Sequence, residues 1–334
     1  MMKSWMMQGY GTPSDKLVQN DVEIPIAKDE EVLIKVKAAS FNPIDFKILR
    51  GDLKMVMKLK FPAPIGYDVS GEIVEKGSKV NDFDKGDEVY SRIGKLGAMA
   101  EYVTAKAKNV AKKPSNITYE QAAGIPLAAL TAYQALFGIA QIEANEYVFI
   151  QAGSGGVGSL AVQLAKTKGA YVSTTTSSVN KNWVQTLGPD QVIDYTRDDY
   201  SILLKDYDVV FDTLGEEHIW GAFEVLKDKG RLVTIAGAID NQTAKEMRLN
   251  KLIRWYLSYK ARKIVREAQK RNILYRYKLM TPNGQQLQEI TRLIEDNKIR
   301  PVVDTVFPFD QANNALQRLT EGRAKGKIIV SMDQ

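Results

Sequence analysis

The hydrophobic pattern of the first third of the chain predicts short strands joined by turns. Residues 31–37 (EVLIKVK) alternate partly between apolar and charged side chains, which is typical of a half-buried strand. Shorter apolar stretches at residues 72–75 and 88–90 lie between turn-forming sequences such as Asn42-Pro43 and Lys85-Gly86-Asp87. We therefore expect a compact, β-rich barrel in this part of the chain.

The pattern changes near Thr118, where strands begin to alternate with helices. Residues 119–139 are rich in Ala and Leu and predict a helix that is interrupted near Pro126. Residues 159–168 predict another helix, which ends before Gly169. Strands are predicted at residues 147–150, 170–175, 190–194, 207–211, 231–235 and 272–280. Strands that alternate with helices indicate a parallel sheet, so this part of the chain belongs to the α/β fold class.

A basic segment with helical spacing lies between the fifth and sixth of these strands. Residues 245–278 contain twelve Lys or Arg and two Asp or Glu, a balance of +10, so the rest of the chain carries −4 of the net +6. This concentration argues against general nucleic-acid binding. We expect a helical insertion over about residues 240–271 whose apolar face, led by Leu252, Trp255 and Tyr256, covers a substrate pocket. The alternatives are docking on an anionic membrane surface and attraction of a phosphorylated carrier such as coenzyme A.

Composition excludes several classes of protein and of site. Apolar residues make up 44% and charged residues 26%, which is typical of a folded globular protein. No apolar run reaches the length of a membrane span, and the first residues show no secretory pattern, so we expect a cytoplasmic protein. The chain has no cysteine, one histidine (His218) and no clustered acidic motif, so we expect no metal site. His218 follows a predicted turn, and we expect it to cap a helix or lie on the surface.

A glycine-rich sequence follows the strand at residues 147–150 and opens the next helix. It reads QAGSGGVG and contains the spacing Gly153-x-Gly155-x-x-Gly158. In this context the first glycine permits a tight turn, the second lets a pyrophosphate approach the backbone, and the third allows close packing of helix on strand. The N–H groups of the helix N-terminus then face the phosphates. We predict a dinucleotide site at Gly153, Ser154, Gly155, Gly156, Val157 and Gly158.

The residues after the second strand of this region indicate NADPH rather than NADH. An NAD site places Asp or Glu there, on the ribose 2′-hydroxyl. Residues 169–189 contain no acidic side chain, and Ser177 and Lys181 stand in that region instead. A hydroxyl and an ammonium group favour a 2′-phosphate, which a carboxylate would repel. We therefore predict NADPH as the cofactor.

Several motifs in this order resemble the zinc-free quinone oxidoreductase branch of the medium-chain dehydrogenase/reductase superfamily, over nearly the whole chain. They are Asn42-Pro-Ile-Asp45, Gly66-Tyr-Asp-Val-Ser-Gly71, Ala100-Glu-Tyr102, Pro126 with Leu130-Thr-Ala-Tyr133, the Gly153–Gly158 loop and Gly322-Arg-Ala-Lys-Gly-Lys327. The resemblance implies a GroES-like β-barrel catalytic domain over residues 1–122, completed by residues 283–334. A Rossmann doubly wound domain over residues 123–282 would be inserted between them. It also implies a substrate cleft between the domains and a homodimer.

The resemblance assigns further residues to the cofactor. Thr131 is expected near the nicotinamide, and Gly237 beside it after the fifth strand. Ser177 and Lys181 are expected at the 2′-phosphate, and Tyr195 beside the adenosine phosphate. Lys327 lies in the tail that is expected to reach back to the cofactor.

The chemistry predicted from this set is hydride transfer to a quinone or an α,β-unsaturated carbonyl compound. Zinc-dependent relatives place ligands where this chain has residues 40–42 and Tyr67-Asp68. A conjugated acceptor spreads the developing charge, so hydrogen bonds and orientation suffice without a metal. Asn42 is the candidate donor to the substrate oxygen, Asp45 would fix its loop, and Tyr67 would donate a hydrogen bond or proton. Structural roles in a turn, a cap and a core are the alternatives for these three residues.

Two other functions remain open from the sequence. One is an NADPH-dependent reductase of aldehydes or acyl thioesters on the same scaffold. The other is a non-enzymatic NADPH sensor that docks on membranes through the basic segment. Turnover of NADPH with a panel of acceptors separates the three.

Overall fold

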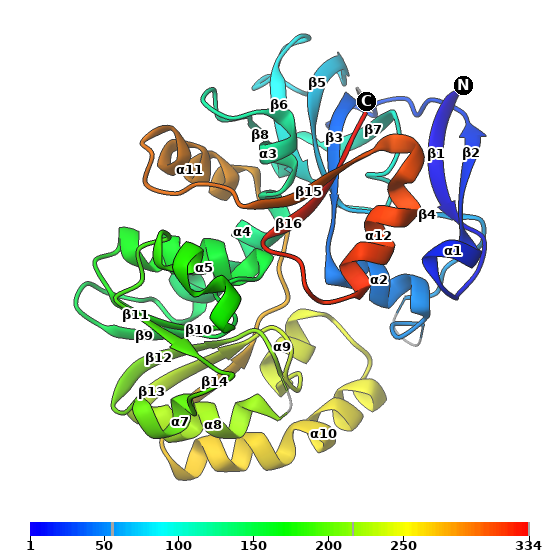
Figure 1. Cartoon of the computed structure of the whole chain (residues 1–334). Coiled ribbons are helices and arrows are strands. Elements are labelled where there is room, and N and C mark those ends of the chain that lie inside the picture. The colour runs from blue at the N-terminus through cyan, green and yellow to red at the C-terminus, as the bar shows by residue number, and fades with distance from the viewer. Residues whose placement is uncertain (55–56, 216, 333–334) are drawn as a thin grey trace. The chain divides into compact units, whose positions relative to one another are not determined.

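A computed structural model describes residues 1–54, 57–215 and 217–332 of the 334-residue chain. The chain forms two compact units, each described here by itself (Figure 1). Unit 1 consists of Met1–Leu130 and Pro282–Gln334, and unit 2 of Thr131–Thr281. The first boundary follows Leu130, whereas the change of pattern was expected near Thr118 and the resemblance implied a boundary after residue 122. The reason is that Ser70 Oγ donates to the Tyr119 carbonyl at 2.5 Å and Leu127 N donates to Asp68 Oδ1 at 3.0 Å, which keeps this stretch in unit 1.

Unit 1 is rich in β-structure, as its alternating pattern predicted. Its main sheet has the order β15-β16-β3-β5-β6-β8, with β7 also paired to β3, and a smaller sheet has the order β2-β1-β4. The strands are β1 (Met2–Met7), β2 (Leu17–Val22), β3 (Glu31–Phe41), β4 (Ala63–Pro64), β5 (Asp68–Lys76), β6 (Glu88–Arg92), β7 (Tyr102–Lys106), β8 (Val110–Lys112), β15 (Val303–Pro308) and β16 (Lys327–Ser331). The helices are α1 (Pro13–Lys16), α2 (Pro43–Arg50), α3 (Tyr119–Ala123), α4 (Pro126–Tyr133), α11 (Gly284–Glu295) and α12 (Ala312–Thr320).

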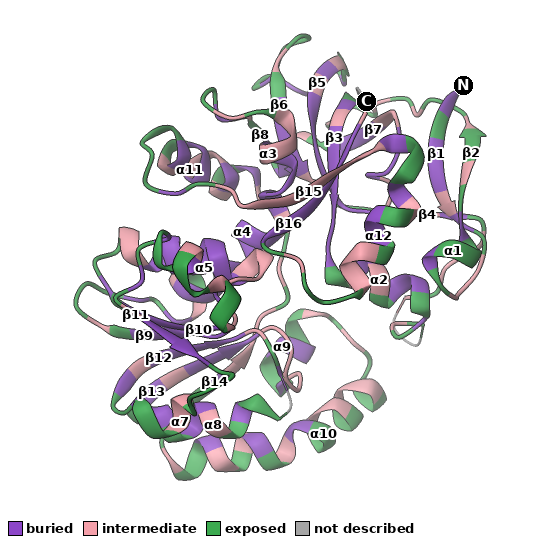
Figure 2. Ribbon diagram, viewed as in Figure 1, coloured by how far each residue is buried: buried purple, intermediate pink, exposed green. Residues whose placement is uncertain are grey.

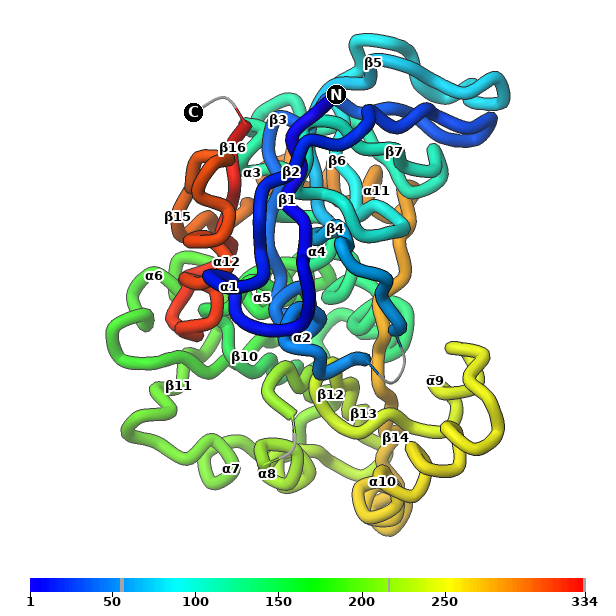
Figure 3. Tube along the Cα trace, turned by 90° about the vertical axis from the view of Figure 1, so that its right-hand side faces the viewer, coloured from blue at the N-terminus to red at the C-terminus, as the bar shows by residue number. Residues whose placement is uncertain are grey.

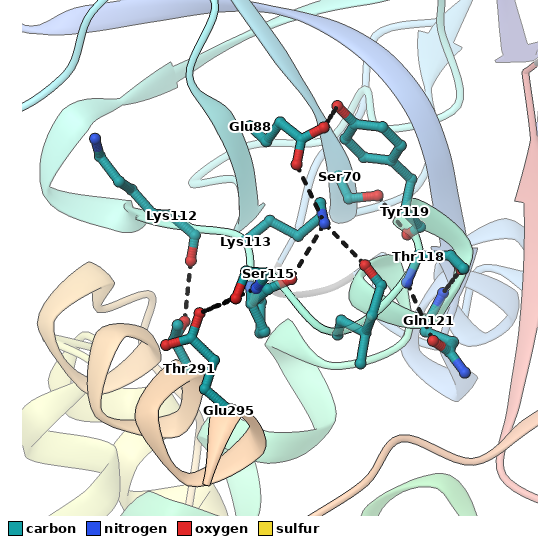
Figure 4. A network of polar contacts seen from close by, with 12 residues as sticks. Ser70, Glu88, Lys112, Lys113, Ser115, Thr118, Tyr119, Gln121, Thr291 and Glu295 are labelled. Atoms are coloured by element: carbon teal, nitrogen blue, oxygen red, sulfur yellow. Dashed lines mark hydrogen bonds and ion pairs between the residues drawn. The ribbon is translucent and has the colours of Figure 1, made fainter. Parts of the chain in front are cut away.

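The C-terminal segment completes unit 1, as the trace in Figure 3 shows. Strand β16 pairs antiparallel with β3, and Ile328 lies opposite Phe41. Helix α11 is tied to the N-terminal segment by the polar contacts of Figure 4. Glu295 accepts hydrogen bonds from the backbone N–H and the hydroxyl of Ser115, both at 3.0 Å, and Thr291 donates to the Lys112 carbonyl at 3.0 Å. The last fifty residues are therefore part of the same core as the first third of the chain.

Unit 2 contains a six-stranded sheet in which every pair of neighbouring strands is parallel. The order is β11-β10-β9-β12-β13-β14, the doubly wound order of dinucleotide-binding folds. The strands are β9 (Tyr147–Ile150), β10 (Tyr171–Thr176), β11 (Gln191–Asp194), β12 (Tyr207–Asp212), β13 (Leu226–Thr234) and β14 (Leu274–Tyr277). The helices are α5 (Gly156–Thr167), α6 (Lys181–Gln185), α7 (Tyr200–Leu203), α8 (His218–Val225), α9 (Asn241–Glu246) and α10 (Lys251–Lys270). The predicted α/β fold class is confirmed.

The helix expected over residues 119–139 breaks where Pro126 predicted. It is divided into α3, α4 and a π-helical segment over Gln134–Ile139. The predicted helix at residues 159–168 begins three residues earlier, at Gly156, because the glycine-rich loop itself forms the first turn. His218 is the first residue of α8 and is exposed.

Helix α10 packs onto unit 2 with a different face from the one that the sequence analysis named. Its buried side chains are Ala261, Ile264 and Ala268, and the last two belong to the hydrophobic core that also contains Ile273 and Tyr275. Most of the rest of the helix is exposed or partly exposed (Figure 2). Leu252 and Trp255 are 80% and 70% exposed. These exposed side chains do not form the face that packs on unit 2, and the expectation that they cover a substrate pocket stays a prediction. The packed residues follow the spacing i, i+3, i+7 of one helix face, which places Leu252 and Trp255 away from it.

Among the described residues, no helix combines the length and the apolar character that crossing a bilayer requires.

Candidate active site

The glycine-rich loop of unit 2 is held against β10 by backbone contacts. Ala152 N donates to Thr175 Oγ1 at 3.0 Å, and Gly153 N donates to the Thr175 carbonyl at 2.9 Å. A Cβ atom on Gly153 would lie 2.3 Å from Thr174 Oγ1. A Cβ atom on Gly158 would lie 2.1 Å from the Ala152 carbonyl oxygen. Both glycines are therefore required by the close approach of the loop, the sheet and helix α5.

Gly155 occupies the N-cap position of α5 and has a different environment. A Cβ atom there would meet only the Ala152 carbonyl, at 3.4 Å. The N–H groups of Gly156, Val157 and Gly158 belong to the first turn of α5, where a helix offers no acceptor of its own. Open space beside unpaired donors at the positive end of a helix fits a pyrophosphate. Ser154 lies on the same loop and is partly exposed.

The end of β10 carries the residues predicted for a 2′-phosphate. Ser177 follows the strand and accepts a hydrogen bond from Asn180 Nδ2 at 3.2 Å. Lys181 is the first residue of α6, is exposed, and forms no ion pair with any residue that the structure describes. Tyr195 follows β11, the neighbouring strand, and is 60% exposed. A hydroxyl and a free ammonium group thus lie at the carboxyl end of the strand next to the glycine-rich loop.

Asp194 lies close to these residues, and the sequence analysis did not single it out. Its carboxylate accepts hydrogen bonds from the hydroxyl of Ser178 and from the hydroxyl and backbone N–H of Thr196, the latter two at 2.7 and 3.0 Å. These hydrogen bonds lower the pKa of Asp194 to about 2. The carboxylate is therefore ionised at neutral pH, and it organises the two loops rather than serving as a free acceptor for a ribose.

Thr131 and Gly237 are the other predicted cofactor residues of unit 2. Thr131 is buried in α4. Gly237 follows β13, and its N–H donates to Thr234 Oγ1 at 2.8 Å. A Cβ atom on Gly237 would contact the Ile219 side chain at 2.5 Å. The loop after β13 is therefore compact, and a larger residue at this position would require the surrounding side chains to shift.

The residues predicted for catalysis lie in unit 1 around the start of α2. Asn42 occupies the N-cap position, and its backbone N–H donates to Asp45 Oδ2 at 2.8 Å. Asp45 thus fixes the loop, as expected. The Asn42 carboxamide is engaged on both sides, because Nδ2 donates to Asp68 Oδ2 at 2.9 Å and Oδ1 accepts from Lys327 Nζ. Asn42 is 2% exposed, and its role as a donor to substrate stays a prediction.

Lys327 is a buried member of this cluster. Its ammonium group donates to the Phe41 carbonyl at 3.0 Å and lies 3.7 Å from Asp68 Oδ2. Burial lowers the pKa of Lys327, and the nearby carboxylates of Asp68 and Asp45 act in the opposite direction. The sequence analysis expected Lys327 at the cofactor, and the structure assigns it these contacts within unit 1.

Asp68 and Arg92 complete the cluster, and neither was predicted as a site residue. Burial raises the pKa of Asp68, while Lys327 and Asn42 oppose that rise. The Arg92 guanidinium carbon lies 4.1 Å from the centre of the Tyr67 ring. Burial raises the pKa of the Tyr67 phenol, which is therefore protonated at neutral pH. The one sequence signal for Asp68 was its place in the Gly66–Gly71 motif, beside the position where zinc-dependent relatives have a ligand. No such indication existed in the sequence for Arg92.

The cluster can hold a polar group in a dry environment. It contains two carboxyl groups (Asp45 and Asp68) and two basic side chains (Lys327 and Arg92), and burial raises the pKa of both carboxyl groups. Asp45 Oδ1 is buried and has no hydrogen-bond partner. Across the described ranges, no three His, Asp or Glu side chains are grouped closely enough to hold a metal ion. The arrangement therefore suits positioning, hydrogen bonding and proton holding.

Asp45 should make the stability of the protein fall as the pH rises. Burial raises its pKa from 3.8 to about 7, so the native state holds a proton that the unfolded state releases between these values. Between these values the free energy of unfolding of the wild-type protein should fall by about 1.4 kcal/mol per pH unit because of Asp45, and Asp45→Asn should abolish this fall. Urea unfolding at a series of pH values measures the free energy of both proteins. Parallel pH profiles for wild type and variant would show that Asp45 does not titrate in this way.

Comparisons with known proteins agree with this geometry. Residues 28–115 match the family model described as alcohol dehydrogenase GroES-like domain, and residues 187–330 match the one described as zinc-binding dehydrogenase. The chain is 34% identical to 2-methylene-furan-3-one reductase of Solanum lycopersicum, over 98% of this chain and 79% of that protein. It is 35% identical to an NADPH-dependent alkenal/one oxidoreductase, chloroplastic, of Arabidopsis thaliana, with the same coverage.

Relatives of the same length give the same result. The quinone-oxidoreductase homolog, chloroplastic, of Spinacia oleracea is 33% identical over 99% of this chain and 98% of that protein. The structure of the quinone oxidoreductase from Coxiella burnetii superposes with a TM-score of 0.84 at 31% identity and covers 99% of both chains. The GroES-like match covers the N-terminal part of unit 1, as predicted. The chain belongs to the zinc-free quinone oxidoreductase branch of the medium-chain dehydrogenase/reductase superfamily.

Proposed function

We propose that this protein is an NADPH-dependent reductase of quinones or α,β-unsaturated carbonyl compounds. The observation that carries the proposal is the pairing of an intact phosphate-binding loop with a free ammonium group and a hydroxyl at the end of β10. The names of the relatives support it, since they include an alkenal/one oxidoreductase described as NADPH-dependent and a quinone oxidoreductase. NADPH, when bound, supplies the hydride.

The residues of the chain have separate tasks in this proposal. The first turn of α5 binds the pyrophosphate, Ser177 and Lys181 bind the 2′-phosphate, and Tyr195 contacts the adenosine phosphate. Thr131 and Gly237 position the nicotinamide. The assignments of the pyrophosphate and the 2′-phosphate rest on the open space at the loop and on Lys181, which forms no ion pair with a described residue. Those of Thr131 and Tyr195 rest on the family resemblance, and that of Gly237 on its place after β13.

Unit 1 contributes the groups for the carbonyl compound. Reduction of an enone adds a hydride to one carbon and a proton to the next, and negative charge develops on the carbonyl oxygen meanwhile. Tyr67 remains protonated at neutral pH and can donate to that oxygen, while Arg92 beside its ring favours the build-up of negative charge. Lys327 and Asp68 hold the Asn42 carboxamide in one orientation. Lys327 and Asp68 are therefore positioning residues in this proposal.

We also propose that the protein is cytoplasmic and forms a homodimer. The cysteine-free composition supports the first statement only in a general way. For the second, β14 is an edge strand of the parallel sheet, and an edge strand is a position at which a second copy of the chain can pair.

The outer face of α10 supports a peripheral contact with an anionic membrane. Leu252, Trp255, Tyr256 and Tyr259 are 80%, 70%, 47% and 52% exposed. The helix carries seven Lys or Arg and one Glu. Aromatic side chains flanked by cations are typical of helices at the surface of a charged bilayer. Contact between two copies through this face would bring cations together, so an anionic partner fits it better.

Turnover of NADPH with a panel of acceptors tests the function. We expect oxidation of NADPH with an alkyl vinyl ketone and with a benzoquinone, because both delocalise the negative charge that develops during reduction. An aliphatic aldehyde and an acyl thioester should react far more slowly. Turnover restricted to the aldehyde or thioester would contradict the proposal in favour of a reductase of those groups. NADPH binding without any turnover would indicate a sensor.

Lys181→Ala tests the assignment of the cofactor. Loss of a charge-assisted contact should weaken NADPH binding by about 1–3 kcal/mol and leave NADH binding nearly unchanged. Fluorescence titration with each cofactor measures both dissociation constants. Equal losses for NADPH and NADH would show that Lys181 does not contact a 2′-phosphate.

Co-sedimentation with anionic vesicles at low salt tests the membrane contact. Lys260→Glu with Lys263→Glu should release the protein, since each surface cation contributes about 1 kcal/mol there. The matched reversal Lys106→Glu with Lys108→Glu, on exposed residues of unit 1, should bind as wild type does. Trp255→Ala should weaken binding, and Trp220→Ala, at a residue 45% exposed on α8, should not. Failure of the wild-type protein to bind such vesicles would exclude this contact.

A further inference from the structure

Unit 2 contains a groove that none of the predicted cofactor residues lines. It has a volume of about 490 Å³ and lies between the start of α9, the middle of α10 and the end of β14. Helix α10 contributes Ala261, Arg262, Val265 and Arg266, and β14 contributes Tyr275 and Arg276. A volume of this size is typical of sites for small organic molecules.

The charged side chains that the groove can offer to a ligand are mostly positive. Asp240 is its only acidic lining residue, and its carboxylate is fully engaged. Oδ1 accepts from the N–H groups of Gln242 and Thr243, at 2.9 and 3.0 Å, and Oδ2 accepts from Thr243 Oγ1 and Tyr277 N, at 2.7 and 2.8 Å. Arg276 is paired with acidic residues, because Nη2 donates to Glu246 at 3.0 Å and Nε lies 3.7 Å from Asp240 Oδ1. The Nε atom itself has no hydrogen-bond partner.

Arg262 and Arg266 are the cations left for a ligand. Arg262 is held in place, since Nη1 donates to the Tyr259 carbonyl at 2.7 Å and its guanidinium carbon lies 3.6 Å from the centre of the Tyr259 ring. Arg266 forms no ion pair with any residue in the described part of the chain. Like charges one helical turn apart repel, so an anion placed between these two guanidinium groups would be bound favourably.

One side chain links the groove to the predicted cofactor loop. Tyr275 lines the groove, and its hydroxyl donates to the Ala238 carbonyl at 2.5 Å. The same hydroxyl lies 3.0 Å from where a Cβ atom of Gly237 would be. Residues 240–242 follow β13, and in doubly wound sheets ligands bind beyond the carboxyl ends of the strands. One wall of the groove therefore lies beside the segment expected to contact the nicotinamide.

We propose that this groove binds the anionic tail of the substrate. The substrate class is then an α,β-unsaturated carbonyl compound whose apolar chain ends in a carboxylate or a similar anion. Ala261, Val265 and the Tyr275 ring contact the chain, and Arg262 and Arg266 bind the charged end. This inference rests on the proposed function, because it names the substrate of that same reaction.

The test compares two substrates that differ only at the far end of the chain. One is an alkyl vinyl ketone with a terminal carboxylate, and the other is its methyl ester, so the reacting groups are identical. We expect wild-type protein to have a KM about tenfold or more lower for the acid than for the ester. Arg262→Gln with Arg266→Gln should remove this difference and leave kcat/KM for the ester within about twofold. The matched control Lys263→Gln, on the same helix but outside the groove, should leave the preference intact.

The possible results distinguish failure of the groove proposal from failure of the proposed function. Equal KM values for acid and ester in the wild-type protein overturn the inference while the proposed function stands. Loss of activity toward both compounds in the arginine variant, with the preference unchanged, also overturns it. If neither compound is reduced, the proposed function fails, and calorimetric titration with the saturated keto acid and its ester tests the groove alone. Binding of the acid that the arginine variant loses would then support the groove, and no binding would reject it.

Discussion

The buried ammonium group of Lys327 is the interaction on which the architecture of unit 1 depends. It contacts Asn42 and Phe41, which precede Lys327 by 285 and 286 positions in the sequence. A charge at this depth is stable only when a counter-charge and acceptors surround it. Asp68 supplies the counter-charge, and the Phe41 carbonyl and the Asn42 side chain supply the acceptors. Removing any one partner would leave another buried without compensation, so the cluster acts as a unit.

This requirement explains how unit 2 can be inserted in the sequence between the two segments of unit 1. The tail must return to place Lys327 on β16 beside β3, whatever lies between. Unit 2 meets the condition because its two ends are tied together, by hydrogen bonds from Gln134 Nε2 to the Thr281 carbonyl at 2.7 Å and from Thr281 N to Gln134 Oε1 at 3.0 Å. A domain whose ends are adjacent can be inserted with little strain on its host.

The sequence predicted those features that depend on neighbouring positions in the chain. Periodicity located each strand of unit 2, with β9 matching its predicted residues 147–150, and the spacing of Gly153, Gly155 and Gly158 located the phosphate loop. Asp68 and Arg92 were missed as members of the cluster because their partners are distant in sequence. For α10, two sets of apolar residues share the helical period. The larger side chains suggested the face that covers a pocket, whereas Ala261, Ile264 and Ala268 form the face that packs on unit 2.

The glycine-rich loop shows how a single motif divides into a folding part and a ligand-binding part. A Cβ atom on Gly153 or on Gly158 would lie less than 2.5 Å from another atom of unit 2, so the fold alone excludes any larger side chain there. Gly155 has no such neighbour, and nothing in unit 2 requires it to be glycine. Its φ of −81° is also open to other residues. Glycine at this position therefore fits the proposed approach of a pyrophosphate to the backbone. The pattern in the sequence does not reveal this distinction, because all three positions carry the same residue.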